Sequence, residues 1–561
     1  MKAPIKKYIP FQGVKLQDRT WPDQKITHAP AWCSVDLRDG NQALVTPMQL
    51  EEKLLLFKTL VDIGFKEIEV GFPSASETEY EIIRTLIDKN YIPDDVTIQV
   101  LVQSRPELIK RTFDAVKGAK NVIVHFYNST STLQRKIVFR EEMEGITKIA
   151  VDGAKLIRTL TEEEIAKSGM NIRYEYSPES FTGTEMDYAV EICEAVMETL
   201  GVTKDNPIIL NLPSTVEMST PNTYADQIEY FIRKMRHREA AIISLHPHND
   251  RGTGVAATEL ALMAGADRVE GTLFGNGERT GNVDIVTLAL NMYSQNVDPQ
   301  LDFSHINDLK KICEQVTKMP IHARHPYAGE LVFTAFSGSH QDAIRKGFEY
   351  MADTNSPYWE VPYLPINPAD LSRDYEPVIR INSQSGKGGA AFVMQQTVGY
   401  HLPKEMHPEF GDIVKAAADQ YGDELGSNQI VDIFNKEYVN YKGKYAIKKL
   451  KFSEESEEAS AATHTKFVGE VLVDGQPFAI SGTGNGPIDS FFNALRQVGV
   501  EGYEFINYHE HAISSGSVSK AISYIELKVP QDGHIFGVGI DANINRASLL
   551  GVINAINRSL R

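Results

Sequence analysis

AIISLHPHND, at Ala241–Asp250, joins an apolar, β-rich run to a polar ending. In a β-strand, residues two apart point to the same side, so His246 and His248 face one way if the strand reaches them. Two imidazoles side by side can bind one metal ion. The alternative is a strand end that carries two exposed histidines with no shared ligand.

The same arrangement recurs along the first half of the chain. Between residue 32 and about residue 291, eight apolar runs alternate with segments of helical periodicity; the runs are 32–37, 66–72, 96–102, 121–127, 171–176, 207–213, 241–247 and 267–274. Eight consecutive βα units predict an α/β fold in which a parallel sheet closes into a TIM barrel. An open doubly wound sheet is the alternative, but it needs a glycine-rich phosphate turn after its first strand, and the sequence has none there.

Polar clusters follow the C-terminal ends of the predicted strands, and this end of a TIM barrel holds the active site. Asp39 follows the first strand, in WCSVDLRDGNQ, and is expected near the two histidines of the seventh. One carboxylate and two imidazoles leave coordination positions open, which suits a divalent ion that also holds substrate and water. Mg²⁺ is the first candidate, and Mn²⁺ or Zn²⁺ also suits these ligands.

The first helix shows capping signals at both ends. Thr46 is expected as its N-cap, with Pro47 at the first helical position and Gln49 completing a capping box. Gly64 is expected as its C-cap. The residues at helical spacing, which should face the barrel, are Leu50, Leu54, Phe57 and Val61.

Composition indicates a large globular protein in a reducing compartment. The chain has 561 residues, of which 42% are hydrophobic, and is too long for a single core. At about 150 residues per domain, its length predicts three or four domains. Only three cysteines occur, without a CxxC pattern, which favours the cytoplasm. The N-terminus has no signal-peptide apolar region, and no apolar stretch reaches membrane-spanning length. The net charge of −18 and the lack of basic runs argue against nucleic acid and anionic membranes as partners.

The chain changes character after the barrel, which suggests further domains. We expect an N-terminal segment with the barrel over 1–300, a post-barrel subdomain over 301–390 and a mostly helical subdomain over 391–450. The polar, acidic segment 451–465 is typical of a linker. Residues 466–561 carry a weak repeat, 470–495 and 525–556, which predicts an α+β domain of two ββα units.

Three segments resemble signature segments of one enzyme family: LRDGNQALVTPMQLEEK at 37–53, HPHNDRGTGVA at 246–256 and GNGERTGNVD at 275–284. They are similar to the isopropylmalate synthase and homocitrate synthase family, whose members are metal-dependent Claisen condensation enzymes built on TIM barrels. EYSPESFTGTE, FSGSHQDAI, VPYLPINPADLSR and RINSQSGKGG extend the resemblance to the longer bacterial and fungal members. The resemblance covers essentially the whole chain.

This resemblance implies an acyltransferase that joins acetyl-CoA to a 2-oxoacid and hydrolyses the thioester. It favours 3-methyl-2-oxobutanoate as the oxoacid, which would give 2-isopropylmalate and begin leucine biosynthesis. Citramalate or homocitrate synthesis is the close alternative, since these reactions differ in the pocket for the oxoacid side chain. A lyase or aldolase on the same barrel and a non-catalytic amino-acid sensor are further alternatives.

The resemblance also assigns site residues. Asp39, His246 and His248 are expected to bind the metal, with Asn282 as a weaker oxygen ligand, although an asparagine after glycine is also a common turn residue. Arg38 would stabilise the developing oxyanion, or else form a rim salt bridge. Thr215 would bind the 2-oxoacid carboxylate, and Glu179 would be a catalytic carboxylate on the substrate side; the alternative for either is a cap on the helix that follows it.

Two further catalytic positions lie outside the barrel sequence. His340, in SGSHQDAI, and Tyr363, in VPYLP, match positions that the family uses in a homodimer, where the post-barrel region reaches the neighbouring subunit's barrel. They are expected to take part in proton abstraction from acetyl-CoA. For His340 the alternative is a helix-terminal histidine bonded to backbone.

The C-terminal domain is expected to bind L-leucine as a feedback inhibitor, as such a domain does in the family. Its glycine turns precede helices, and a helix N-terminus favours an anion such as an amino-acid carboxylate. A dimerisation or packing module is the alternative. The residues expected at this site are Gly484, Asn485, Gly486, Pro487, Gly539 and Ala542.

Overall fold

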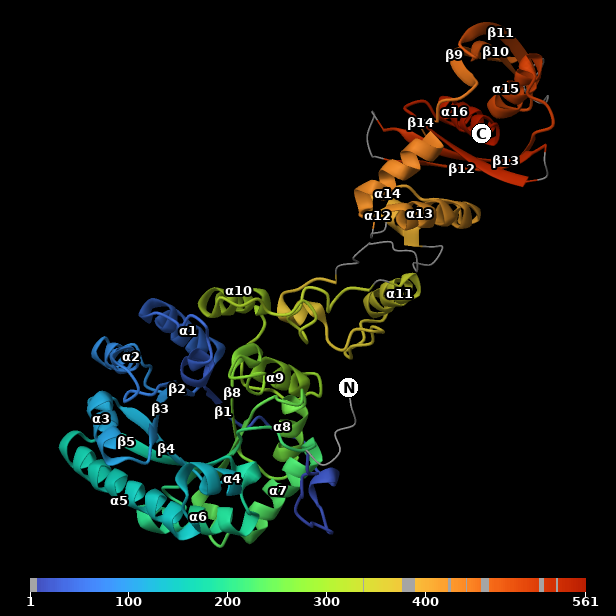
Figure 1. Ribbon diagram of the computed structural model, residues 1–561. Coiled ribbons are helices and arrows are strands. Elements are labelled where there is room, and N and C mark those ends of the chain that lie inside the picture. Colours follow the sequence, from blue (N-terminus) through green and yellow to red (C-terminus); the bar gives the residue numbers. More distant parts are fainter. Residues whose placement is uncertain are drawn as a thin grey trace. The chain divides into compact units, whose positions relative to one another are not determined.

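The computed structural model describes residues 8–335, 337–375, 389–421, 425–439, 441–455, 464–513, 519–530 and 533–561. The chain divides into two compact units. The first comprises Met1–Phe333 with Ile366–Asp374, and the second comprises Thr334–Pro365 with Tyr375–Arg561. Figure 1 shows the elements of both units in sequence colours. Among the described residues we find no helix with the length and apolar character that crossing a membrane requires.

The first unit contains a closed barrel of eight parallel strands, as predicted. The strands are β1 Ala31–Ser34, β2 Glu67–Gly71, β3 Thr97–Gln103, β4 Asn121–Ser129, β5 Asn171–Glu179, β6 Ile208–Ser214, β7 Ala241–Pro247 and β8 Arg268–Gly271. Pairing of β1 with β8, with Ala31 opposite Arg268, closes the ring. Each predicted run therefore overlaps one strand of the barrel, and the prediction of eight strands is confirmed.

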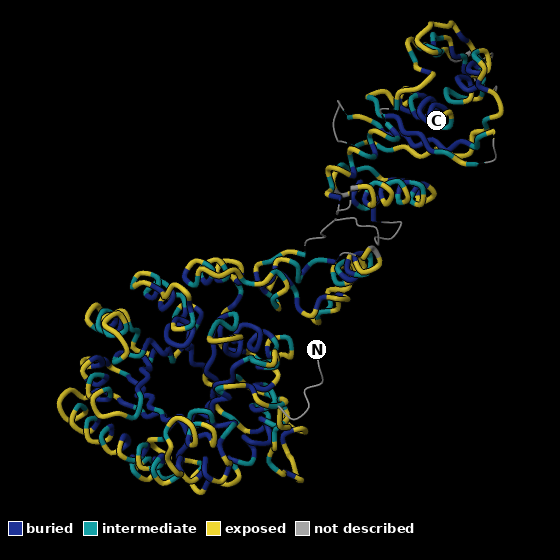
Figure 2. Tube along the Cα trace, in the orientation of Figure 1, coloured by how far each residue is buried: buried dark blue, intermediate teal, exposed yellow. Residues whose placement is uncertain are grey.

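Helices surround this ring, and Figure 2 shows buried strands inside helices whose outer faces are exposed. The helices are α1 Leu50–Ile63, α2 Glu77–Asp88, α3 Pro106–Val116, α4 Thr132–Gln134, α5 Met143–Ser168, α6 Met186–Leu200, α7 Pro221–Lys234, α8 Gly254–Met263 and α9 Ile285–Tyr293. Outward strand residues such as Ile98, Val100 and Val102 of β3 are fully buried. Alternate positions such as Gln99 point into the barrel, where Gln99 contacts Glu270 of β8. The barrel interior is thus polar and its outer wall is apolar.

The predicted start and buried face of the first helix are wrong, while its predicted end is confirmed. Helix α1 begins at Leu50, with Gln49 rather than Thr46 as the N-cap, and the Gln49 amide donates to Glu52. Gly64 ends the helix with a φ of 117°. The buried residues are Lys53, Leu56, Phe57, Leu60 and Ile63, so only Phe57 of the four predicted residues is buried.

The second unit begins with α11 Gly338–Thr354, which packs on the segment around Val361: a Cβ on Gly347 would lie 3.0 Å from the Val361 Cα. Three helices follow, α12 Gly389–Val398, α13 His407–Tyr421 and α14 Ser427–Phe434. They share one apolar core with the last sheet of the chain. This core contains Phe410 and Phe434 from the helices and Tyr524 and Val538 from the sheet. In the first unit, α10 Ile306–Thr317 packs on α1.

The C-terminal region contains two antiparallel sheets, each of three strands rather than the predicted two. One has β9 Tyr445–Glu455, β10 His464–Val473 and β11 Gln476–Gly484, followed by α15 Pro487–Leu495. The other has β12 Glu504–Ala512, β13 Ala521–Val529 and β14 Gly533–Asp541, followed by α16 Ile544–Ser559. The described ends of the segment predicted as a linker, 451–465, belong to β9 and β10, and residues 456–463 lie outside the described residues.

Candidate functional site

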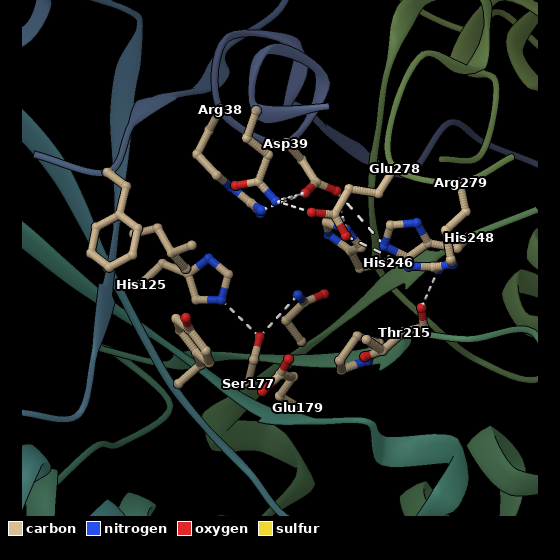
Figure 3. Close-up of a pocket in the computed structure, with 16 residues that line it drawn as sticks. Arg38, Asp39, His125, Ser177, Glu179, Thr215, His246, His248, Glu278 and Arg279 are labelled. Carbon is tan, nitrogen blue, oxygen red and sulfur yellow. Dashed lines mark hydrogen bonds and ion pairs between the residues drawn. The ribbon is translucent and has the colours of Figure 1, made fainter. Parts of the chain in front are cut away.

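A pocket opens at the C-terminal ends of the barrel strands, where the polar clusters were expected. Figure 3 shows the side chains that line it, which come from loops and strand ends all around the ring. The lining residues are Arg38, Asp39, Gln42, Phe72, Leu101, His125, Tyr127, Ser177, Glu179, Asn211, Pro213, Thr215, His246, His248, Glu278 and Arg279. The pocket therefore gathers most of the residues singled out from the barrel sequence.

The turn after β1 explains how two consecutive residues reach one pocket. Residues Asp36–Gly40 form a single π-helical turn, so Arg38 and Asp39 both turn inward instead of alternating as in a strand. The Asp36 carboxylate anchors the turn, because it accepts a hydrogen bond from the Leu273 amide on the far side of the β1–β8 seam. The strand therefore ends before Arg38, and both Arg38 and Asp39 line the pocket.

Asp39, His246 and His248 meet at the floor of the pocket. The Asp39 Oδ2 atom lies 3.2 Å from the His246 Nε2 atom and 3.7 Å from the His248 Nε2 atom. One ligand atom from each of the three residues lies within 4.8 Å of the others, which is the spacing of a metal-binding group. All three side chains are buried.

A fourth residue, Asn282, fits a metal ion at this place. His248 pairs with Asn282 in an isolated β-bridge, which brings the loop after β8 beside the histidines. The Asn282 Oδ1 atom and the His248 Nδ1 atom are buried, and neither has a hydrogen-bond partner among the residues that the structure describes. A buried polar atom without a partner is costly, and a cation satisfies a carbonyl oxygen such as Asn282 Oδ1, while His248 offers it only one ring nitrogen. The donor set therefore fits a divalent metal.

The local electrostatics separate the protonation states of the three residues. Burial alone would raise the pKa of Asp39, but Arg38 and the two histidines hold it well below its ordinary value. Burial lowers the pKa of His246, but its hydrogen bonds to Asp39 and Glu270 outweigh this and raise it to about 9. Burial and the neighbouring His246 lower the pKa of His248 to about 4. A cation that binds here displaces a proton from His246, since an imidazole ligand must be neutral.

Arg38 is buried and makes two ion pairs. Its Nη1 atom donates to Asp39 Oδ1 at 2.7 Å, and its Nε atom donates to Glu69 on β2. These contacts agree with the salt-bridge interpretation and hold the guanidinium in one orientation at the pocket wall. They do not remove it from the pocket, which it lines.

Glu179 and Thr215 lie on the opposite wall. The Glu179 carboxylate, at the end of β5, accepts from the Ser129 hydroxyl, and burial raises its pKa. The Thr215 hydroxyl accepts from the Ser180 amide at 2.9 Å. Neither side chain caps a following helix, and both line the pocket.

Several lining residues were not predicted from the sequence. Glu278 and Arg279 belong to the recognised GNGERTG segment, and Arg279 takes a left-handed backbone with a φ of 57°. His125 and Ser177 lie at inward positions of β4 and β5 and share a hydrogen bond of 2.7 Å. The alternation of inward and outward positions along a strand was the available signal, but only closure of the ring shows which inward residues reach its mouth.

His340 and Tyr363 lie in the second unit. Their rings stack, with centroids 4.1 Å apart. The side chain of Tyr363 is 62% exposed, and His340 is also exposed. His340 and Tyr363, which the sequence assigned to the same proton abstraction, therefore form one solvent-exposed pair.

The glycines of the C-terminal units hold helices close to sheets. A Cβ on Gly539 would lie 1.9 Å from the Ala547 carbonyl oxygen of α16, and one on Gly484 would lie 2.5 Å from the Ser490 amide of α15. The backbone amide of Asn485 donates a hydrogen bond to the Asp489 carboxylate at 2.8 Å. A carboxylate of the protein itself therefore already lies at the N-terminus of α15. Pro487 begins α15, whereas Ala542 is exposed in the turn before α16. A Cβ on Gly486 meets nothing within 4 Å.

Comparison with known proteins divides the chain into three matched parts. The HMGL-like family matches residues 29–313, the post-catalytic domain-like family of alpha-isopropylmalate synthase matches 330–395, and the LeuA allosteric (dimerisation) domain matches 424–560. The first match spans the barrel, and the last spans both C-terminal sheets.

Full-length relatives give the same result. A 2-isopropylmalate synthase of Clostridium acetobutylicum is 54% identical over 99% of this chain and 99% of its own length. One of Mesorhizobium japonicum is 56% identical over 100% of this chain and 99% of its own length. One of Brucella suis is 54% identical, with 98% of each chain covered. With identity at this level over its whole length, the chain belongs to the 2-isopropylmalate synthase family.

Proposed function

We propose that the pocket joins the methyl carbon of acetyl-CoA to the ketone carbon of 3-methyl-2-oxobutanoate and hydrolyses the thioester, giving 2-isopropylmalate and CoA. As a member of its family, the chain is a transferase of leucine biosynthesis. The observation that carries the proposal is the convergence of Asp39, His246 and His248 beside Arg38 at the barrel mouth.

Asp39, His246, His248 and Asn282 would hold the divalent metal, with Mg²⁺ the first choice and Mn²⁺ or Zn²⁺ as alternatives. When bound there, the metal acts as a Lewis acid on the 2-oxoacid and as a template for its carboxylate and ketone oxygens. Arg38 lies at the same wall, and its guanidinium stabilises negative charge that develops on the ketone oxygen. The Thr215 hydroxyl binds the oxoacid carboxylate, and Glu179 contacts the substrate from the end of β5.

The pocket wall favours an aliphatic oxoacid over one with a second carboxylate. Leu101 and Pro213 line the pocket. Both guanidinium groups that line it are already paired: Arg38 with Asp39 and Glu69, and Arg279 with Asp250 at 2.6 Å. A dicarboxylic oxoacid would require an additional cation, so homocitrate synthesis is disfavoured.

Abstraction of the methyl proton needs a positioned base. His340 and Tyr363, as a stacked and exposed pair, are the candidates, and they would act in the barrel of a second subunit of a homodimer. The match to an allosteric (dimerisation) domain supports both self-association and a regulatory ligand. We infer that this ligand is L-leucine. It would bind between the two C-terminal sheets with their helices, near Gly484–Pro487 and Gly539–Ala542.

We also infer that the enzyme works in the cytoplasm. In the described part of the chain, Cys33, Cys193 and Cys313 are free and buried. Burial raises the pKa of all three thiols, so they are unreactive and suit a reducing compartment.

The deciding experiment measures CoA-thiol release by metal-free protein after a single divalent ion is restored. The substrates are acetyl-CoA with 3-methyl-2-oxobutanoate, pyruvate, 2-oxoglutarate or glyoxylate. We expect the highest kcat/KM with 3-methyl-2-oxobutanoate and no release without metal. Preference for pyruvate or 2-oxoglutarate would overturn the substrate assignment. Undiminished CoA release in excess chelator would overturn the proposed requirement for a divalent metal.

A further inference from the structure

A layer of charged and amide side chains fills the barrel directly beneath the proposed metal site. Glu69 of β2, Gln99 of β3, and Arg268 and Glu270 of β8 are all 0% exposed. Charges at such depth are costly unless they are paired and hydrogen-bonded. Their arrangement shows where each charge is directed.

Glu270 receives four hydrogen bonds. Its Oε2 atom lies 2.7 Å from His246 Nδ1 and accepts from Asn211 Nδ2 at 3.1 Å. Its Oε1 atom accepts from Arg268 Nη1 and Gln99 Nε2, each at 2.8 Å. A carboxylate has about four acceptor sites, so these donors leave Glu270 a single orientation.

This orientation decides how His246 presents its ring. The nitrogen that faces Glu270 carries a proton, since a carboxylate only accepts. The other nitrogen, Nε2, faces Asp39 at 3.2 Å, and it is the one that gives up its proton when a metal binds there. A histidine ligand held in this way has a fixed tautomer and a fixed ring plane.

The same layer also orients Arg38. Glu69 accepts from Arg38 Nε through Oε2, and through Oε1 it accepts from Gln99 Nε2 at 3.1 Å. The Gln99 amide therefore connects the carboxylate that holds His246 to the carboxylate that holds Arg38.

Arg268 argues against a second metal in this layer. His125, Glu175 and Glu270 are spaced like metal ligands. The Arg268 guanidinium already lies against two of them, with its Nη1 atom 2.8 Å from Glu270 and its Nη2 atom 3.4 Å from Glu175. This positive charge fills the role that a cation would have.

We propose that Glu270 is a positioning residue that fixes the tautomer and ring orientation of His246 for metal binding. Glu69 holds Arg38 in the same layer, and Gln99 connects the two. The inference rests on the proposed metal site at Asp39, His246 and His248, and it assigns to a fully buried β8 carboxylate a role in metal affinity.

Glu270→Gln is the most informative variant because it keeps the volume of the side chain. Its single oxygen should stay with the Arg268 cation and Gln99, which leaves its amide facing His246. The amide then donates to Nδ1, the His246 proton moves to Nε2, and the ring no longer offers that nitrogen to a metal. Glu270→Asp keeps the charge but shortens the reach to His246. Glu69→Gln is the matched control, since it removes a carboxylate from the same layer without touching His246.

The experiment titrates metal-free full-length protein with Mn²⁺ and follows free Mn²⁺ by electron paramagnetic resonance. Both Glu270 variants should bind about 10- to 100-fold more weakly than wild type. Glu69→Gln should change the affinity less than about threefold but lower kcat, because it loosens Arg38. In parallel, ¹⁵N-histidine spectra of the metal-free protein are recorded at alkaline pH, where the His246 ring has lost one of its two protons, with the His246 signals assigned from His246→Ala. They should show the remaining proton on Nδ1 in wild type and on Nε2 in Glu270→Gln.

Equal Mn²⁺ affinities of Glu270→Gln and Glu69→Gln, or a neutral wild-type His246 ring whose single proton is on Nε2, would overturn the proposal. If Glu270→Gln does not fold, Glu270→Asp and the wild-type spectrum decide. Wild-type protein that binds no Mn²⁺ but keeps its Nδ1 proton would instead reject the proposed metal site and leave the orienting contact intact.

Discussion

The rings of His340 and Tyr363 stack with centroids 4.1 Å apart and planes inclined by 25°. Tyr363 adopts a left-handed backbone with a φ of 66°, a conformation that costs a non-glycine residue energy. An exposed aromatic pair held by strained backbone gains little stability from burial. Strain of this kind concentrates at functional sites, which makes the pair a good target for a test of subunit sharing.

Mixing Arg38→Ala protein with His340→Ala protein should restore activity if the pair acts in a neighbouring barrel. Each variant alone is expected to be inactive. In a mixed dimer, one barrel keeps Arg38 and receives an intact His340, so a random mixture should reach roughly a quarter of wild-type activity. CoA release after subunit exchange measures this. No recovery, in a sample where native mass spectrometry detects mixed dimers, would mean that the pair serves its own chain.

His246→Ala should remove both bound metal and turnover. The variant loses one of three ligands at the pocket floor, and turnover should fall by a factor of about 100 or more, since metal polarisation is worth several kcal/mol. Metal content of the purified protein and CoA release report the two effects. His237→Ala, at an exposed position before β7, is the control and should keep both. Stoichiometric metal with normal turnover in His246→Ala would place the metal elsewhere.

Lys53 should prove important for the stability of the barrel. Its side chain is fully buried in α1 and pairs with Glu79 of α2, which also accepts from the Phe72 amide after β2. Lys53→Ala leaves the Glu79 charge without its partner and should cost about 3–5 kcal/mol. Differential scanning calorimetry should show a lower Tm for the transition that includes the barrel. Lys53→Met combined with Glu79→Gln removes both charges and should restore most of the loss; a Tm unchanged in Lys53→Ala would contradict this account.

Lys53 also explains why the apolar face of α1 was mispredicted. The four residues chosen from the sequence follow a helical spacing, but the helix is rotated so that Lys53, Leu56 and Leu60 face inward. A buried lysine is an exception that spacing cannot reveal, because its partner Glu79 lies on another helix. The barrel itself was predictable, since each strand has its own apolar run and each run ends in a polar cluster.

The candidate site was predictable only where a residue belongs to a contiguous motif. Asp39, His246 and His248 follow strands whose ends converge by geometry, so their meeting could be foreseen. Gln99 and Glu270 are 171 positions apart in sequence and meet only because the barrel closes. Strand β12 escaped prediction for a different reason: nearly all its residues are exposed, so the alternation that marks a strand is absent.

Leucine binding should be weakened by a bulky residue at Gly486. This glycine has an extended backbone with a φ of −176°, and a Cβ there meets nothing within 4 Å, so Gly486→Trp should fold. A large side chain at the start of α15 would cover the proposed site. Calorimetric titration of the full-length protein with L-leucine should give at least about a tenfold weaker Kd, and inhibition should weaken in parallel because binding and inhibition are linked. Glu501→Trp, an exposed position in the same region, is the control; equal leucine affinity in all three proteins would place the site elsewhere.

Acidification should weaken the attachment of β12 to the segment after α12. The His401 amide donates to the Nε2 atom of His511 at 3.0 Å, which requires that nitrogen to be unprotonated. Burial lowers the pKa of His511, and the adjacent His401 lowers it further. A base with a depressed pKa in the folded state contributes stability above its unfolded pKa of about 6.5, and loses it as pH falls through the folded value, because the unfolded chain takes up the proton first. Between pH 7.5 and 5.5 the Tm of the transition that includes β12 should therefore fall more in wild type than in His511→Gln, whose side-chain oxygen can accept the same hydrogen bond without titrating. Parallel Tm curves for the two proteins over this range would show that His511 does not control the pH response.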